Sequence, residues 1–238
     1  MQTTSHSRMA PLDFDAIKDM QNSANDLLHS SIVQQAFVNE KEEKWVNDVS
    51  ESSLRILEVC GMSKDVLLFV KEHLQELQFT LRRASIGEPG IEEKITSHNC
   101  YRKKLKKETL KCLKWLRGVK SNIVTLHPPM KEQKLKLVVD VLREVRMTSI
   151  SIVESLLSLI SAPWLDSKHG GKRSFASKFL QNCDDDDIFD AMMLQSAKKR
   201  LAGVQIAIED LEVELECMFR RLIHTRVLLL NILTNCEV

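Results

Sequence analysis

Glycine and proline are scarce in this chain, which contains seven glycines and five prolines among 238 residues. Together they supply less than half of the share of about 12 % that an average protein has. Because these two residues interrupt helices most strongly, their scarcity favours long, uninterrupted helices. No stretch shows the sustained alternation of apolar and polar residues that marks a half-buried strand. We therefore predict an all-α fold, an antiparallel bundle of long helices with coiled-coil-like heptad packing.

Recognisable catalytic, nucleotide-binding and metal-binding motifs are also absent. The segment Gly170–Ser174 superficially resembles a phosphate-binding loop, but Asp166 stands where that motif requires its first glycine. No HExxH pair, Glu-x-x-His pair, zinc-like Cys/His spacing or GxSxG turn occurs. Residues distant in the sequence can still meet in a fold. The sequence nevertheless predicts a non-enzymatic protein with no catalytic, cofactor-binding or metal-binding residues and no cofactor.

Signals for secretion or membrane insertion are missing as well. Residues 1–15 are polar and lack the apolar core of a signal peptide. Apolar runs such as Val227–Leu230 fall far short of the roughly 18 residues that a membrane-spanning helix needs. The six cysteines are scattered without a CxxC pair, which favours reduced thiols. The expectation is an intracellular protein, with the cytoplasm as the favoured compartment and no signal peptide or transmembrane segment.

The strongest helical signal in the chain lies in residues 201–232. Apolar residues recur there at steps of three and four, a spacing that keeps one stripe of a helix against its neighbours. This first seam contains Leu201, Val204, Ile208, Leu211, Leu215, Met218, Leu222, Thr225, Leu229 and Ile232. A second seam, its predicted partner, contains Leu135, Val138, Leu142, Val145, Ser149, Ile152, Leu156 and Leu159. The irregular mix of residue types in the first seam favours packing within one chain, so a monomer is preferred over a helical dimer.

Further helices are expected before these seams, giving five to seven in all. The first should cover about residues 12–29. A second, over about residues 38–60, should end at Gly61 as a left-handed cap. Ser63 should then cap a third helix, and the short connection predicts that the second and third helices are antiparallel neighbours.

The expected domain organisation is simple. Residues 1–11 are predicted to form a flexible N-terminus, and residues 12–238 a single helical-bundle domain with an irregular loop at about 161–187. A basic helix before the second seam should end near Gly118. The acidic run Asp184–Asp187 is expected at the start of a helix, where negative charge is favourable, and the last helix is expected over residues 201–232.

Positive charge is concentrated in residues 101–120, which hold nine Lys or Arg and one Glu, although the whole chain has a net charge of only +1. At about 100° per residue, seven of these cations share one helix face within an arc of about 160°. They are Lys103, Lys104, Lys106, Lys107, Lys111, Lys114 and Arg117, opposite an apolar stripe of Leu105, Cys112, Leu116 and Val119 with Trp115 at its boundary. Such a face can attract anionic lipid, an acidic protein or, less favourably, nucleic acid, and a basic amphipathic helix also resembles a calmodulin target. The alternative is a solvated outer face that the acidic run at residues 184–187 partly neutralises.

Two serines are candidates for phosphorylation. Ser85 follows Arg82 and Arg83, and Ser174 follows Lys172 and Arg173. A phosphate at either serine would add nearly two negative charges beside basic residues and could order the local backbone.

Several blocks of the sequence resemble a plant-specific family, the BYPASS-like proteins, over residues from about 27 to the end. The blocks are Glu43–Asp48, Ser53–Gly61, Lys64-Asp65, Gln75–Gln78, Leu81–Arg83, Leu211-Glu212, Phe219–Val227 and Asn231–Leu233. The resemblance implies a helical protein associated with root and shoot development. It supplies no catalytic or cofactor residues, because none are established for the family. The chain departs from the family at its start, where members often carry a longer Ser/Pro/Arg-rich segment.

These observations give two functional hypotheses. The first is a non-enzymatic helical interaction protein in plant development, with an unidentified protein partner. The second is a peripheral protein that binds an anionic membrane or nucleic acid through the basic helix at residues 101–120. Salt-dependent binding to lipid or nucleic acid would distinguish them.

Overall fold

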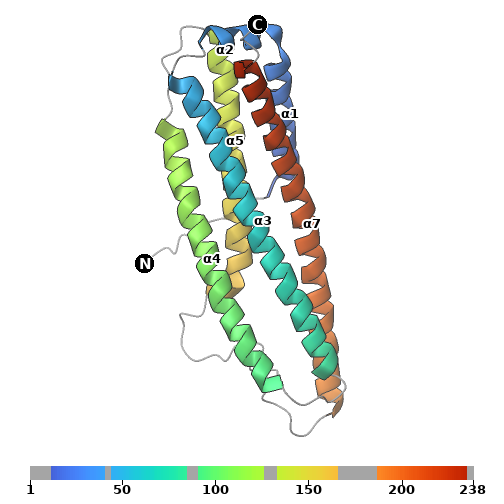
Figure 1. Ribbon diagram of the computed structural model, residues 1–238. Coiled ribbons are helices and arrows are strands. Elements are labelled where there is room, and N and C mark those ends of the chain that lie inside the picture. The colour runs from blue at the N-terminus through green and yellow to red at the C-terminus, as the bar shows by residue number, and fades with distance from the viewer. Residues whose placement is uncertain (1–11, 41–43, 85–90, 126–132, 166–186, 235–238) are drawn as a thin grey trace, which may run out of the picture. The chain divides into compact units, whose positions relative to one another are not determined.

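The computed structural model describes residues 12–40, 44–84, 91–125, 133–165 and 187–234 of the chain. These residues form six α-helices and no strand (Figure 1). The helices are α1 (Phe14–His29), α2 (Ser31–Asn39), α3 (Lys44–Ala84), α4 (Ile91–Thr125), α5 (Gln133–Leu165) and α7 (Asp187–Thr234). The predicted all-α helical bundle is therefore confirmed for this part of the chain. The predicted N-terminal segment and most of the predicted loop lie outside the described residues.

The chain divides into two compact units, and each is described by itself. Unit 1 contains Met1–Ser63, Cys112–Leu159 and Glu214–Val238. Unit 2 contains Lys64–Lys111 and Ile160–Val213. Helices α3, α4, α5 and α7 contribute residues to both units.

Unit 1 has an extensive apolar core to which all six helices contribute. Its largest fully buried side chains are Phe37, Ile17, Leu28, Ile56, Leu116, Leu135, Leu142, Ile150 and Leu156. Burial of each such side chain stabilises the fold by about 1.5–3 kcal/mol relative to exposure. The apolar periodicity of the sequence is thus used to build this core.

The first helix is set by a local cap. It begins at Phe14 because Oδ1 of Asp13 accepts a hydrogen bond from the backbone N–H of Ala16 at 2.9 Å. It ends at His29, as predicted, and extended backbone at Ser30 separates it from α2. Helix α2 was not predicted from the sequence, and the helix expected to start near residue 38 starts at 44 instead.

Gly61 does not end a helix, and this corrects the prediction of a hairpin. Helix α3 runs through it without a positive φ angle, and a Cβ atom placed there would touch nothing within 4 Å. Ser63 is not a cap either, since its hydroxyl donates to the Val59 carbonyl oxygen at 2.8 Å. The buried stripe continues unbroken across the glycine at positions 56, 59, 60, 63 and 67. Packing therefore outweighs the roughly 1 kcal/mol that a glycine costs inside a helix, and the two predicted antiparallel helices are one.

Two other helices are longer than predicted. Helix α4 passes Gly118, where a Cβ atom would again touch nothing within 4 Å, and it reaches Thr125 because Val119 continues its buried stripe. Helix α5 extends to Leu165, so helical structure continues into the first residues of the predicted loop. Helix α7 begins at Asp187, within the predicted acidic start.

The two predicted seams are largely buried. In α7 the buried positions are Ile208, Leu215, Met218, Leu222, Thr225, Leu229 and Ile232, and in α5 every predicted position is buried except one. The predictions are wrong for Val204, which is 48 % exposed, and for Leu159, which is 41 % exposed. Both lie toward the end of a seam, where a helix of 3.6 residues per turn has drifted by about 20° per heptad from a strict 3.5-residue repeat. At the end of α5, Leu157 and Ile160 take over the buried stripe.

The single polar residue of the α7 seam has a specific partner. The hydroxyl of Thr225 donates to Oδ1 of Asn25 on α1 at 2.7 Å, and both side chains are buried. One helix level away, the Gln21 amide donates to the Met218 carbonyl oxygen at 3.3 Å. These hydrogen bonds join α1 to α7 within unit 1 and satisfy the Thr225 hydroxyl and Nε2 of Gln21, whereas Oε1 of Gln21 is buried without a hydrogen-bond partner among the described residues.

Two arginines of unit 1 reach the same turn of α3. Arg146 of α5 donates through Nη1 to the Ser52 hydroxyl. Arg226 of α7 donates through Nη1 to the Ser50 carbonyl oxygen at 2.7 Å and to the Ser53 hydroxyl at 2.9 Å. Arg146 is only 4 % exposed, and its Nη2 has no hydrogen-bond partner among the described residues. A polar layer thus crosses the core of unit 1.

In unit 2, α3 and α7 are joined by polar pairs. Nζ of Lys71 lies 2.7 Å from Oε2 of Glu212, and the Gln78 amide donates to that of Gln205. Lys71 precedes Gln78 on α3, whereas its partner Glu212 follows Gln205 on α7, so the two segments are antiparallel. Because Gln205 contacts α3, the adjacent Val204 turns outward.

Candidate functional site

The basic face of α4 is the candidate site, and the burial of the opposite side of the helix positions it. The four predicted apolar positions are all buried, with Leu105 and Leu116 each 1 % exposed. At 100° per residue this burial orients the opposite arc toward solvent. All seven predicted cations are exposed: Lys103, Lys104, Lys106, Lys107, Lys111, Lys114 and Arg117. We call these seven residues the basic face.

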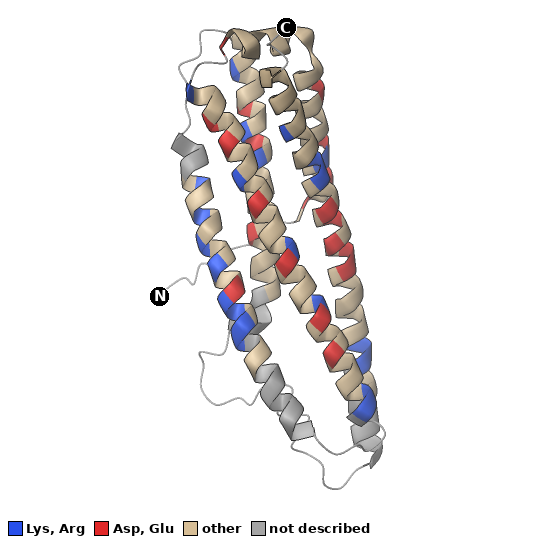
Figure 2. Ribbon diagram, viewed as in Figure 1, with Lys and Arg blue, Asp and Glu red and all other residues tan. Residues whose placement is uncertain are grey.

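The charge of the basic face is uncompensated within the part of the chain that the structure describes. None of the seven cations forms an ion pair there. Lys120, outside the face, pairs with Glu154 at 3.5 Å. In Figure 2 the ribbon of α4 is coloured mostly for Lys and Arg along the basic face, whereas the ribbon of α3 carries residues of both signs. The predicted neutralisation by Asp184–Asp187 lies outside the described side chains.

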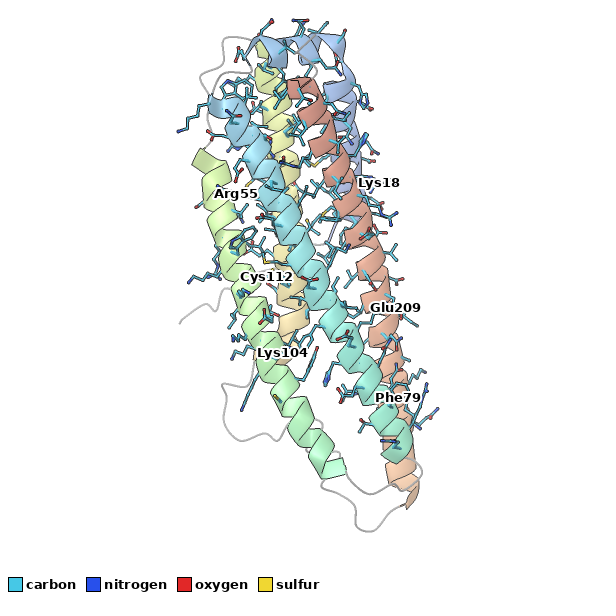
Figure 3. All side chains as sticks on the ribbon, in the orientation of Figure 1. Lys18, Arg55, Phe79, Lys104, Cys112 and Glu209 are labelled. Carbon is cyan, nitrogen blue, oxygen red and sulfur yellow. The ribbon has the colours of Figure 1, made fainter. Side chains whose placement is uncertain are left out.

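One lysine of the face is held by an aromatic ring. Nζ of Lys104, labelled in Figure 3, lies 4.6 Å from the centre of the Phe69 ring on α3. The Phe69 ring stacks on Tyr101 with 4.6 Å between centroids, and Tyr101 stacks on His73 with 3.4 Å between centroids. Cation–π contacts of this kind contribute about 0.5–1 kcal/mol at exposed sites. This stack fixes the start of the basic face against α3 within unit 2.

The Tyr101 hydroxyl is part of the same stack. It donates to the Phe69 carbonyl oxygen at 3.2 Å. Burial raises the pKa of Tyr101 above its ordinary value of 10.0, and the negative charge of Glu72 adds to this effect. The neutral phenol is therefore favoured in the folded state, which also keeps negative charge away from the lysines.

Tyr101 should ionise at higher pH in the folded protein than in the unfolded chain. Its folded-state pKa is raised, so the folded state binds more protons above pH 10 and the free energy of unfolding falls there as the pH rises. Because it is the only tyrosine, phenolate absorbance reports on it alone. We expect ionisation near pH 10 in urea and a clear upward displacement without urea. Coincident titrations would contradict the burial of this hydroxyl.

Two apolar side chains are exposed beside these cations. Leu110 is 48 % exposed and lies inside the basic arc, between Arg117 and Lys103 around the helix. Trp115 is 37 % exposed and lies at the edge of the arc. Sequence reasoning placed Trp115 at the boundary but missed Leu110, although its angular position on the helix could have revealed it.

The structure does not describe the two serines that the sequence predicts as phosphorylation sites. Ser85 and Ser174 lie outside the described residues. Among the residues described, no cluster of three or more His, Cys, Asp or Glu side chains could hold a metal ion. No described helix is both long and apolar enough to pass through a bilayer.

Comparison with known proteins gives one match. A family model described as Protein BPS1 matches residues 13–232, which is nearly the whole chain. Comparison with curated proteins and with solved structures found no match.

Proposed function

Because the chain belongs to the Protein BPS1 family, we propose that it acts in plant development as a non-enzymatic helical protein that binds an anionic partner through the basic face of α4. Membership of this family supports the association with plant development. Action in root and shoot, which the resemblance implies, is part of the proposal.

The observation that supports anion binding is the exposure of seven cations on one helix with no acidic partner among the described residues. Like charges held this close repel one another, and an anionic surface relieves that repulsion as it binds. A face that served only for solvation would gain nothing from this concentration of one sign. Residues 101–120 contribute a charge of +8, whereas the whole chain has a net charge of only +1. The remaining residues of the chain therefore carry a net negative charge.

An acidic protein that wraps the helix is disfavoured by the packing of α4. Calmodulin-like recognition captures the apolar side of an amphipathic helix. That side is buried here, with Cys112 2 % exposed and Val119 4 % exposed. Such a partner would have to unpack the helix from the bundle, whereas a partner that reads only charge would not.

Reversal of four charges tests the proposal. In the variant Lys103→Glu, Lys107→Glu, Lys111→Glu, Lys114→Glu, we expect affinity for an anionic probe to fall at least about 100-fold, since each lysine near an anionic surface contributes about 1 kcal/mol. The probes are vesicles of phosphatidylcholine with phosphatidylserine, and a DNA duplex. Binding of the wild-type protein should weaken steeply as salt rises.

A control variant reverses the same number of exposed lysines on other helices, namely Lys18, Lys44, Lys134 and Lys136. It has the same net charge as the test variant and should retain binding within a few-fold of the wild type. Circular dichroism of both variants checks that the helices remain intact. If the wild-type protein binds neither probe, or if both variants lose affinity equally, the proposed function is wrong.

A further inference from the structure

We infer that the partner of the basic face is the surface of an anionic lipid bilayer, with Leu110 and Trp115 entering the headgroup region. This inference rests on the proposed function and specifies its ligand. It starts from the two exposed apolar side chains that lie in and beside the cationic arc, 48 % and 37 % exposed respectively.

The position of Leu110 distinguishes a bilayer from other polyanions. Cations surround it on the same face, so any partner that contacts them also covers this leucine. The interfacial region of a bilayer accepts leucine and stabilises its burial, while the headgroup charges meet the lysines. A phosphate backbone offers no apolar environment, so the leucine would lose water without gaining contacts.

Trp115 supports the same partner. Tryptophan is enriched at the level of the lipid headgroups, where its ring is partly apolar and its indole N–H remains hydrated. The ring lies at the edge of the cationic arc, which suits a helix resting on the membrane plane. Its partial exposure leaves it available for this contact.

Nucleic acid is less well matched by these residues. Six of the seven cations are lysines, whereas the planar guanidinium of arginine is the better suited group for nucleic-acid recognition. Single strands are bound by stacking on exposed aromatic rings. The described part of α4 offers a single exposed ring for such stacking, Trp115, since Tyr101 is already stacked on His73 with 3.4 Å between centroids.

The contact with the bilayer should be shallow. The apolar side of α4 stays inside the bundle, with Leu105 and Leu116 each 1 % exposed. The helix therefore cannot turn over and insert as free amphipathic helices do. Attachment depends on lysine charge plus one or two apolar side chains, which predicts peripheral, salt-sensitive binding with a fixed orientation.

The test replaces the leucine in the full chain. Leu110→Ser should weaken binding to vesicles of phosphatidylcholine with phosphatidylserine by about 3–10-fold, as expected for the loss of a half-exposed leucine from an apolar contact. Binding to a DNA duplex should remain within about twofold. The matched control is Leu137→Ser on α5, since Leu137 is 59 % exposed and lies beside Lys136 but outside the basic face. This control should bind vesicles as the wild type does.

A second measurement tests directly whether Trp115 enters the headgroup region of the bilayer. Brominated lipids in the same vesicles should quench part of the tryptophan fluorescence of the wild-type protein. The quenched component should disappear in Trp115→Phe, which leaves the other tryptophans in place.

The outcomes separate this inference from the proposed function. If the charge-reversed variant loses affinity but Leu110→Ser behaves like Leu137→Ser and no quenching occurs, the bilayer inference is wrong and the anion-binding proposal stands. Binding to the duplex without binding to vesicles also refutes the inference alone. If the wild-type protein binds neither probe, both are wrong.

Discussion

Replacing Arg146 with methionine is expected to raise the free energy of unfolding of unit 1 by about 1–3 kcal/mol. The guanidinium is 4 % exposed and donates to the Ser52 hydroxyl, and its Nη2 has no hydrogen-bond partner among the described residues. Burial lowers the pKa of Arg146 from its ordinary value to about 10, which corresponds to roughly 3 kcal/mol of destabilisation. Methionine fills a similar volume without a charge, and Ser52 keeps its contact with the Val49 carbonyl oxygen at 3.4 Å.

The pH dependence of this effect has a definite sign. Above about pH 10 the unfolded chain binds more protons at Arg146 than the folded chain does, so the stability of the wild type relative to the methionine variant rises as the pH rises. Urea denaturation of both proteins at pH 8 and near pH 11 should show a smaller difference at the higher pH. Arg146→Lys keeps a charge at the site and should not stabilise. A methionine variant less stable than the wild type at pH 8 would mean that the arginine contributes favourable contacts.

Replacing Leu156 with alanine should lower the free energy of unfolding by about 2–5 kcal/mol, because this side chain is fully buried in unit 1 and its loss leaves a cavity. Leu159→Ala is the matched control, since Leu159 lies on the same helix and in the same predicted seam but is 41 % exposed. It should cost about 1 kcal/mol or less.

Urea denaturation curves of the two alanine variants provide the comparison. Equal losses in the free energy of unfolding would show that Leu159 is packed like Leu156. That result would contradict the drift of the buried stripe away from the predicted seam. A small loss at Leu156 would show that the core of unit 1 can collapse around the missing side chain.

The sequence was sufficient to predict the long helices and the composition of their buried sides. Periodicity in α7 identified the buried positions from Ile208 to Ile232, because one stripe of a helix must face its neighbours whatever those neighbours are. The basic face was predictable for the same reason. Once Leu105 and Leu116 are buried, helical geometry alone leaves the seven cations exposed.

Other features depend on how helices align with one another. Gly61 is a common helix terminator, but the stripe that continues on both sides of it is packed, so the helix continues. The stack of Tyr101 on His73 requires the axial register of α4 against α3, which no local pattern contains. The contact of Thr225 with Asn25 likewise joins residues 200 positions apart.

The polar pairs between α3 and α7 in unit 2 have a consequence for alignment. A repeating apolar stripe is nearly indifferent to a slide of seven residues, because each leucine meets another leucine. Lys71 with Glu212 and Gln78 with Gln205 remove that degeneracy, since both pairs meet in only one setting. A slide by one heptad in one direction would place Lys71 opposite Phe219 and Gln78 opposite Glu212. A slide in the other direction would bring Lys64 to Glu212 but would place Lys71 opposite Gln205 and Gln78 opposite Lys198, so the Gln78–Gln205 pair would be lost. The two pairs together therefore select one axial register of α3 against α7 among several registers that bury similar apolar side chains.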